Sequence, residues 1–379
     1  MRLALLFSVL ATAASALVAP RNNDGCITPK VFIVSMFSPE DVWTAPLKLT
    51  HNVSLPGLSP LFPYVNCNAA RDVCHLITGE GEINAAATIS ALVLSDKFDL
   101  RKTYFLFAGI AGVNPHIATT GSVGLARYAV QVALAYELDA RQIPSNWTTG
   151  YWVQGTKRPG TLDGAVIYGT EVFELNTNLR DKVRALIPSD IKLNDTATAA
   201  AYRATYNYTP ANAPPAVFYG DVATSDVYFA GNLLSEAFGN ITQLWTNNTG
   251  VYALTAQEDN ASFEAMVRAH KVKRVDFSRV VLMRTASDFD RAPTGKNAYD
   301  AFVADQGGFE PAVENIFVAG NYIVQGILKN WGAFKGGVPA QDGWLHDADI
   351  FHTLSMKRRA LEQRGVERRR VQRGVPLVQ

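Results

Sequence analysis

The sequence predicts an α/β protein with a single domain, in which a mixed central sheet is flanked by helices. Three observations lead to this fold class. Short apolar runs rich in β-branched and aromatic residues alternate with helical segments over most of the chain. Glycine-rich turns follow several of these runs. The chain has 379 residues, of which 48% are hydrophobic, so it is long enough to bury a large core.

The first half of the chain begins with a clear strand. Residues 30–37, KVFIVSMF, have the composition of a fully buried strand. Residues 73–94 predict a strand, a glycine turn and an Ala-rich helix, and residues 104–115 predict a strand that ends in a glycine-rich turn. Residues 121–131 predict one further strand.

Residues 141–215 differ in composition, with scattered Pro, Gly and Thr and three Asn-X-Ser/Thr sequons. We interpret them as a surface insertion within the domain, with one helical piece at residues 171–186. The later elements are expected as strand-turn-helix twice, a strand with a polar loop, and an amphipathic helix, at residues 216–239, 251–270, 279–293 and 314–334.

The two ends of the chain are expected to lie outside this domain, which we assign to residues 26–355. Residues 1–19 contain one Arg, an apolar run and then small residues, the pattern of a secretory signal peptide. The run is short of the ~20 apolar residues that span a bilayer, so an uncleaved anchor is the less favoured alternative. No later stretch predicts a membrane span. Residues 356–379 are basic and predict a disordered tail, with contact to a polyanion or a membrane surface as the alternative.

Cysteines and sequons agree with an extracellular or cell-wall location. Cys67 and Cys74 flank a short polar turn between two strand-like runs, which predicts a disulfide and leaves Cys26 unpaired. The alternative is that all three thiols are reduced. A sequon at Asn260 is expected to stay unused if its helix start is buried. Glycans are expected at Asn52, Asn146, Asn194, Asn207, Asn240 and Asn247.

The net charge of +1 gives the chain no overall field that would attract nucleic acid or an anionic membrane. A neutral small molecule is therefore the expected partner. No Cys or His spacing suggests a metal site, and no cofactor is expected.

Five polar or glycine-rich segments follow the expected strands in a distinctive order. This order resembles that of purine nucleoside phosphorylases and methylthioadenosine nucleosidases over about residues 30–334, and the whole chain resembles the fungal purine nucleoside permease family. The resemblance implies a nucleoside phosphorylase-like fold, a purine nucleoside as ligand and a homo-oligomer. The segments are GEG at 79–81, GIAG at 109–112, GDVATSDVY at 220–228, AQEDN at 256–260 and RTASD at 284–288.

The resemblance also assigns roles to single residues. Asp288 is implied as the general acid that protonates N7 of the purine, and Ser287 orients its loop. Glu258 is implied to bind the ribose hydroxyls, beside Gln257, where the related families have Met. Tyr228 is implied to stack on the base. Each has a plainer explanation: a helix cap for Ser287 and Asp288, an acidic first helical turn for Glu258, and a core position for Tyr228.

The choice between water and phosphate as the nucleophile depends on residues at the glycine-rich turn, GIAG at 109–112. Hexamer-type phosphorylases carry an Arg and a Ser where this chain has Phe107 and Ile110, and a buried dianion without an Arg partner is costly. Nucleosidases instead use a Glu as general base and an Arg, which correspond to Glu40 and Arg284. The alternative is that Glu40 only follows a Ser cap in a first helical turn. Gly109 and Ile110 are expected against the ligand, since glycine lets the backbone approach closely.

The sequence thus predicts a secreted purine nucleosidase that converts adenosine, inosine or guanosine and water into free base and ribose. Two alternatives stay open. One is a phosphate-dependent phosphorylase, and the other is a nucleoside-binding component of nucleoside uptake.

Overall fold

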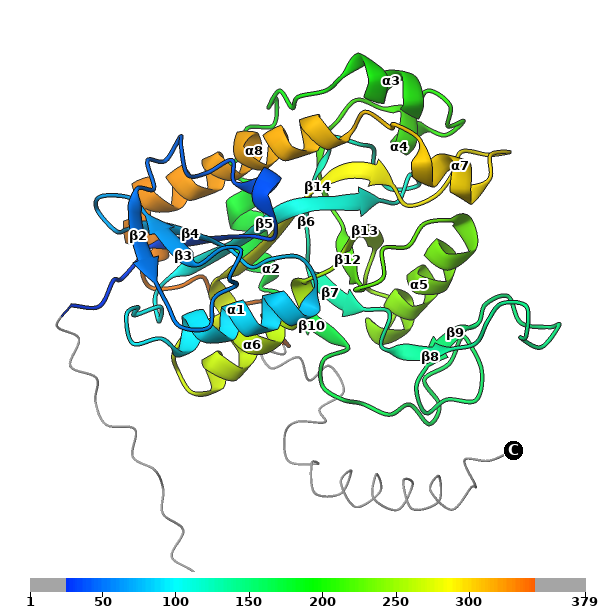
Figure 1. Cartoon of the computed structure of the whole chain (residues 1–379), viewed down its shortest axis with the longest axis horizontal. Coiled ribbons are helices and arrows are strands. Elements are labelled where there is room, and N and C mark those ends of the chain that lie inside the picture. Colours follow the sequence, from blue (N-terminus) through cyan, green and yellow to red (C-terminus); the bar gives the residue numbers. More distant parts are fainter. Residues whose placement is uncertain (1–24, 345–379) are drawn as a thin grey trace, which may run out of the picture.

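The predicted first strand forms β1 (Val31–Ser35), in which every residue is buried. It lies inside a large mixed sheet between β4 (Val73–Ile77) and β5 (Tyr104–Val113) and pairs with both in parallel. The computed structural model describes residues 25–344 (Figure 1). The expected signal peptide and the expected basic tail lie outside these residues.

Strand β5 joins the two halves of the sheet because it changes partners along its length. Its first residues pair with β1, whereas Gly112 and Val113 pair antiparallel with β13 (Tyr252–Ala256). Strand β14 (Val280–Phe289) runs parallel to β5 over nearly its whole length. Since β1 and β13 approach from opposite directions, both end beside the middle of β5. The segments that follow these two strands are thereby brought together.

The other strands extend the sheet on both sides of this centre. They are β2 (His51–Ser54), β3 (Tyr64–Cys67), β6 (Val123–Leu125), β7 (Tyr128–Gln131), β10 (Val172–Glu174), β11 (Val217–Tyr219) and β12 (Asp221–Thr224). A separate small sheet of β8 (Ala135–Glu137) and β9 (Tyr151–Val153) projects from the body at the lower right of Figure 1.

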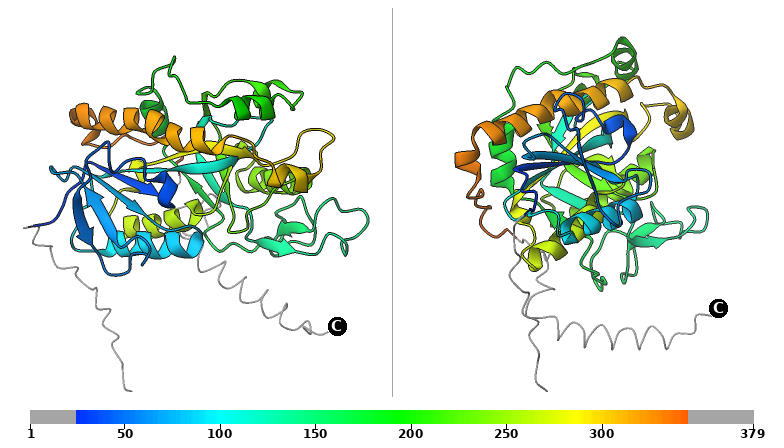
Figure 2. Two further views of the ribbon diagram at one scale, coloured as in Figure 1. Left: turned by 45° about the horizontal axis from the view of Figure 1, so that its top comes forward. Right: turned by 60° about the vertical axis from the view of Figure 1, so that its left-hand side comes forward.

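Helices cover both faces of the sheet (Figure 2). Helix α8 (Phe309–Lys329) packs on β14 and β5 from one side, and its buried residues recur every three or four positions, as one apolar stripe requires. Helices α1 (Glu82–Leu94) and α6 (Asp259–Lys271) pack together on the other side. The remaining helices are η1 (Ser38–Glu40), α2 (Thr177–Arg184), α3 (Ala197–Arg203), α4 (Thr209–Asn212), α5 (Asn232–Trp245), η2 (Phe277–Arg279), α7 (Ala298–Val303) and α9 (Trp331–Phe334).

Two local predictions are wrong. Residues 171–186 are not helical throughout, because Val172 and Phe173 are buried and pair with β7 in the central sheet. The helix begins only at α2, where the Asn176 side chain caps the backbone N–H of Leu179. Residues 121–131 form two short strands, β6 and β7, with different partners. Part of the expected insertion therefore belongs to the central sheet.

Candidate active site

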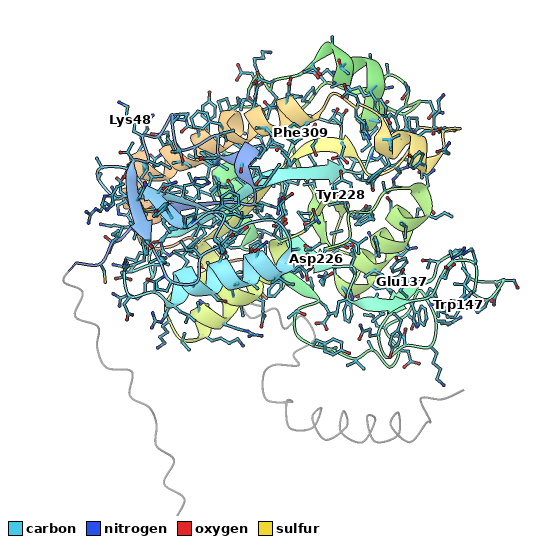
Figure 3. The ribbon with its side chains drawn as sticks, viewed as in Figure 1. Lys48, Glu137, Trp147, Asp226, Tyr228 and Phe309 are labelled. Carbon is cyan, nitrogen blue, oxygen red and sulfur yellow. A yellow bond between two sulfur atoms is a disulfide. The ribbon has the colours of Figure 1, made fainter. Side chains whose placement is uncertain are left out.

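A cavity of about 440 Å³ lies where β1 and β13 end beside β5, a volume typical of small-molecule sites. The predicted site residue Gly109 does not line it. Tyr228 and Phe309, labelled in Figure 3, line it from the loop before α5 and from the start of α8. The other eight predicted residues line the cavity: Glu40, Ile110, Tyr228, Gln257, Glu258, Arg284, Ser287 and Asp288.

Glu40 is buried at the end of η1, and its carboxylate turns into the cavity. Its Oε2 accepts a hydrogen bond from Met36 N and its Oε1 accepts one from Ile110 N, both over 2.7 Å. Burial raises the pKa of Glu40 from its ordinary value of 4.5 to about 7, against the attraction of Arg284 and these two hydrogen bonds. A carboxyl group with this pKa can take a proton from water near neutral pH.

The alternative for Glu40, a first helical turn after a Ser cap, is correct about the turn but wrong about the cap, since Glu40 ends the single turn of η1. The residue before η1 is Phe37, and no side chain caps this short helix. The side chain of Glu40 is only 1% exposed and is held by two backbone N–H groups, one just after β1 and one within β5. Its position depends on the pairing of β1 with β5, which local sequence does not reveal.

Gly109 provides the space in which Glu40 and Arg284 meet. A Cβ atom at this position would lie 2.5 Å from Glu40 Oε1 and 2.8 Å from Arg284 Nη1, well inside van der Waals contact. Any side chain here would push these two groups apart. Gly109 thus lies behind the cavity lining, whereas the sequence-based expectation places it against the ligand.

Arg284 is buried and is held by two acidic residues at the start of α6. Its Nε and Nη2 donate to the two oxygens of Asp259 over 3.2 and 2.5 Å, and Nη2 also donates to Glu258 Oε2 over 3.2 Å. Its Nη1 donates to the carbonyl of Ile110. Burial by itself would lower the pKa of Arg284, but Asp259 and Glu258 keep that pKa above its ordinary value.

Asp259 is absent from the sequence-based prediction, because the resemblance assigns a role only to Glu258. Yet the Asp259 side chain is fully buried, and behind the cavity lining it forms the closer of the two ion pairs of Arg284. The available signal was the pair of adjacent acids after one strand, opposite an Arg in another. Such a signal becomes specific only when the two strands are known to be neighbours of β5.

Glu258 precedes the first residue of α6 and is 4% exposed. Its Oε1 accepts a hydrogen bond from Gly81 N over 3.1 Å, and Gly81 has a φ of 86° that favours glycine. Burial raises the pKa of Glu258, against the attraction of Arg284. The Gln257 side chain donates to the carbonyl of Asp226 over 3.0 Å. Oε1 of Glu258 has one donor and can accept a second, from a ligand hydroxyl.

Asp288 lies within β14 and not in the loop expected after it. The register of β14 against β5 shifts between Ala286 and Asp288, a bulge that redirects the side chain. Oδ2 accepts a hydrogen bond from the Tyr228 hydroxyl over 2.8 Å, and Ser287 Oγ donates to Oδ1 over 2.6 Å. Burial raises the pKa of Asp288, and these two hydrogen bonds oppose the rise. The helix-cap alternative for Ser287 and Asp288 is therefore wrong.

Aromatic side chains form the rim of the cavity. Tyr228 meets Phe302 edge to face, with ring centroids 5.6 Å apart, and Phe37 meets Phe309 at 6.4 Å. Tyr228, Phe302 and Phe309 remain about half exposed. Only Tyr228 is predicted from the sequence, because the other three stand in no recognisable motif. Exposed aromatic faces at the mouth of a cavity can hold a flat ring.

The two carboxyl groups that can transfer protons stand at different points along β5. Glu40 contacts the backbone of Ile110, whereas Asp288 pairs with Gly112. Two residues of extended strand span about 7 Å. A molecule lying along this stretch would meet a base at one end and an acid at the other.

Negative charge dominates the cavity wall. Arg284 is the only cation among the described residues that line it, and it is already paired with two carboxylates. Within residues 25–344, no three His, Cys, Asp or Glu side chains are grouped so as to hold a metal ion. The wall thus disfavours an anionic ligand. The carboxyl groups that line the cavity are those of Glu40, Glu80, Glu258, Asp288 and Asp305.

Away from the cavity, Cys67 and Cys74 form a disulfide between the antiparallel strands β3 and β4. Cys26 forms no disulfide within the described residues. Asn260 is 3% exposed, and its side-chain amide donates to the carbonyl of Thr170, so its sequon is inaccessible. The six asparagines predicted to carry glycans are exposed: Asn52, Asn146, Asn194, Asn207, Asn240 and Asn247.

The family model described as purine nucleoside permease matches residues 28–339. The chain belongs to the purine nucleoside permease family. A family relative from Candida albicans, a purine nucleoside permease, is 44% identical over 334 residues, which cover 87% of this chain and 82% of the relative. A probable purine nucleoside permease of Schizosaccharomyces pombe is 38% identical over 345 residues, covering 87% of this chain and 98% of its own.

Among solved structures, this family member is similar to a 5′-methylthioadenosine/S-adenosylhomocysteine nucleosidase from Colwellia psychrerythraea. The TM-score is 0.47 at 15% identity, covering 83% of this chain and 98% of the other. Futalosine hydrolase of Helicobacter pylori gives a TM-score of 0.45 at 12% identity, covering 79% and 98%. The likeness is weak at this level, and nothing about the substrate follows from it. No helix within residues 25–344 of this permease-family chain is both long and apolar enough to cross a membrane.

Proposed function

We propose that this member of the purine nucleoside permease family hydrolyses the N-glycosidic bond of purine nucleosides, giving free base and ribose. One observation carries the proposal. Glu40 and Asp288 line the same cavity about two strand residues apart, and burial raises the pKa of each carboxyl group. Such a pair can supply a base and an acid at neutral pH.

In the proposed reaction, Glu40 removes a proton from a water molecule beside Arg284, and the oxygen of that water attacks C1′ of the ribose. The bond from C1′ to N9 breaks, and its electron pair stays with the purine. Asp288 gives its proton to N7, so the base leaves as a neutral molecule. One water is consumed, and the proton gained by Glu40 replaces the proton lost by Asp288 through solvent.

Glu258 has a separate part in this scheme. Its Oε1 can accept a hydrogen bond from a ribose hydroxyl, and its negative charge favours the positive charge that develops at C1′. Tyr228, Phe302 and Phe309 offer aromatic faces to the purine ring at the mouth of the cavity. These contacts are the basis for purine nucleosides as the substrate class, which the family name also suggests.

A second candidate is a protein that binds nucleosides for uptake without cleaving them. The family name favours it, and so does the Tyr228 hydroxyl, which already satisfies the oxygen of Asp288 that a purine N7 would need. The two candidates differ in one measurable outcome. A binding protein keeps the nucleoside intact, whereas a nucleosidase consumes it.

The test is incubation of the purified full chain with inosine, adenosine and guanosine, with and without inorganic phosphate. We expect free base and ribose to form at equal rates in both conditions, measured by chromatography. Base release only with phosphate, together with ribose 1-phosphate, would identify a phosphorylase. Tight nucleoside binding without base release would favour the uptake candidate.

We also propose that the chain is secreted. The pattern of residues 1–19, the Cys67–Cys74 disulfide and the exposed sequons support this, because disulfides persist in oxidising compartments. N-terminal sequencing of the protein from culture medium should find a start near residue 20. Treatment with an N-glycosidase should lower its apparent mass, and protein found only inside cells with residue 1 intact would contradict the proposal.

A further inference from the structure

We propose that Asp259 selects the nucleophile, because it engages Arg284 as a second carboxylate beside Glu258 and so excludes phosphate from the cavity. This inference rests on the proposed function and extends it to a residue that the hydrolytic scheme does not use. It concerns a competition between two molecules, water and phosphate, for one place beside Arg284. A guanidinium group is a strong ligand for phosphate when its charge and its N–H groups are free.

The hydrogen bonds of Arg284 leave few N–H donors free to bind an anion. A guanidinium has five N–H donors. Asp259 takes two of them, from Nε and Nη2, and Glu258 takes the second proton of Nη2. The carbonyl of Ile110 takes one from Nη1. One N–H of Nη1 is left, and Nη1 lies near Gly109, where Glu40 also approaches.

The charges around Arg284 also oppose the binding of phosphate. Arg284 and Glu258 together are neutral, and Asp259 makes the group of three carry one negative charge. Ionised Glu40 adds another beside Arg284. A phosphate dianion would therefore meet net repulsion in a buried wall, where few water molecules screen it. Water carries no charge, and it can accept from the remaining N–H while donating to Glu40.

Asp259 also fixes the direction of the guanidinium. Its two oxygens bind the Nε and Nη2 edge, the same fork that would bind two phosphate oxygens. The Asp259 side chain is fully buried at the first residue of α6, so its own position is firmly held. Without this carboxylate, the group would lose its net negative charge, because only Glu258 would balance Arg284, and the two N–H donors that Asp259 engages would be released.

The test compares Asp259→Asn with wild type. Asparagine keeps the size but removes the charge. Phosphate binding is measured by calorimetry and by the rise in Tm with inorganic phosphate at constant ionic strength. We expect wild type to bind phosphate too weakly to detect, and Asp259→Asn to gain affinity by about tenfold or more, the effect of about 1.4 kcal/mol. With inosine and phosphate, the variant should yield ribose 1-phosphate besides ribose.

Two control variants test whether the negative charge of Asp259 is what excludes phosphate. Asp259→Glu keeps the charge and should still exclude phosphate. Glu264→Gln removes a carboxylate from the same helix, where it pairs with Arg268 away from the cavity, and should behave like wild type. If Asp259→Asn does not fold, Asp259→Ser, a smaller residue common at helix starts, takes its place in the same titration.

Two results would overturn the inference. One is phosphate binding by wild type that matches that of the variant, and the other is a folded Asp259→Asn or Asp259→Ser protein with no gain in phosphate affinity. The titration needs no turnover, so it is independent of the proposed function. A chain that releases no base but gains phosphate affinity on loss of Asp259 would keep the exclusion of phosphate by Asp259 and reject the nucleosidase.

Discussion

The hydroxyl of Tyr228 donates a hydrogen bond to Oδ2 of Asp288 over 2.8 Å, and both residues line the cavity. Oδ1 of Asp288 has its own hydroxyl donor, Ser287, so each oxygen of this carboxyl group is engaged. A base that accepts a proton from Asp288 must displace or share one of these contacts. Tyr228 is half exposed at the cavity mouth, and so it is the contact that can move.

Tyr228→Phe should move the alkaline limit of activity to higher pH. The hydrogen bond from Tyr228 favours ionised Asp288 and lowers its pKa against the effect of burial, so loss of the hydroxyl raises that pKa. A general acid works only while protonated, so activity should persist by about one further pH unit. The measurement is the pH profile of kcat/KM for base release. Tyr299→Phe, on exposed α7, is the matched control. If the alkaline limit of Tyr228→Phe equals that of wild type, the Tyr228 hydroxyl does not control the protonation of Asp288.

Asp288→Asn should lower base release by about 100- to 10,000-fold, because an amide cannot protonate N7. The amide oxygen can still accept the Tyr228 hydrogen bond, so the fold should be kept, as circular dichroism would show. Asp305→Asn changes another carboxylate of the cavity rim, exposed and bonded to Gly307 N, and should retain activity within about twofold. Near-normal base release by Asp288→Asn would remove the general-acid role.

Replacing Cys67 and Cys74 together by Ala should lower the free energy of unfolding without changing the chemistry. The disulfide closes a short loop, with a separation of seven residues, so the chain-entropy model gives a loss of about 2–3 kcal/mol. Neither cysteine lines the cavity. Urea unfolding measures the loss, and kcat/KM for base release should equal that of wild type. A matching loss of kcat/KM in the folded variant would mean that the β3–β4 pair supports the site.

The strands and helices with strong local patterns could be predicted from the sequence. The first strand and the long strand β5 consist of nearly uniform apolar runs, and α8 has a helical repeat of buried residues. Strand β10 could not be predicted, because its three residues are stabilised by pairing with β7 and not by their own pattern. Tertiary pairing decides such short elements.

The candidate site could be predicted only in part, because some of its residues stand in recognisable local patterns and others depend on tertiary pairing. Glu40, Glu258 and Asp288 stand out in polar segments that end or follow apolar strands, where ligand-binding side chains are common in α/β sheets. Asp259 and the bulge at Asp288 depend on which strands are neighbours of β5 and in which register. The sequence alone reveals neither the neighbours of β5 nor their register. The sequence-based prediction therefore omits Asp259 and places Asp288 in a loop. Gly109 was misjudged for the same reason, since the groups that crowd it come from distant segments.

Glu40→Gln should change how both activity and stability depend on pH. In wild type, activity should fall as the pH drops below about 7, because protonated Glu40 cannot take a proton from water. The variant has no base at this position, so base release should drop by about 100-fold or more at and above pH 7, and the difference from wild type should shrink at lower pH. A variant that retained the acid limit of wild type would show that another group sets it.

Glu40 makes the free energy of unfolding fall as the pH rises, whereas a salt-bridged carboxylate makes it rise. Its pKa is higher in the folded chain, about 7, than its ordinary value of 4.5, so between these pH values the folded state holds a proton that the unfolded state has lost. Stability is therefore fully present below about pH 4.5 and falls as the pH rises through about 7, by about 3 kcal/mol. Urea unfolding at several pH values should find this loss in wild type and in Glu80→Gln, which changes an exposed carboxylate of the same cavity. Glu40→Gln should lack it, whatever its absolute stability, since glutamine offers one acceptor where Glu40 accepts from both Met36 N and Ile110 N. Parallel pH slopes for Glu40→Gln and wild type would mean that the pKa of Glu40 is the same in the folded and the unfolded chain, and Glu40 would then not set the acid limit of activity near pH 7.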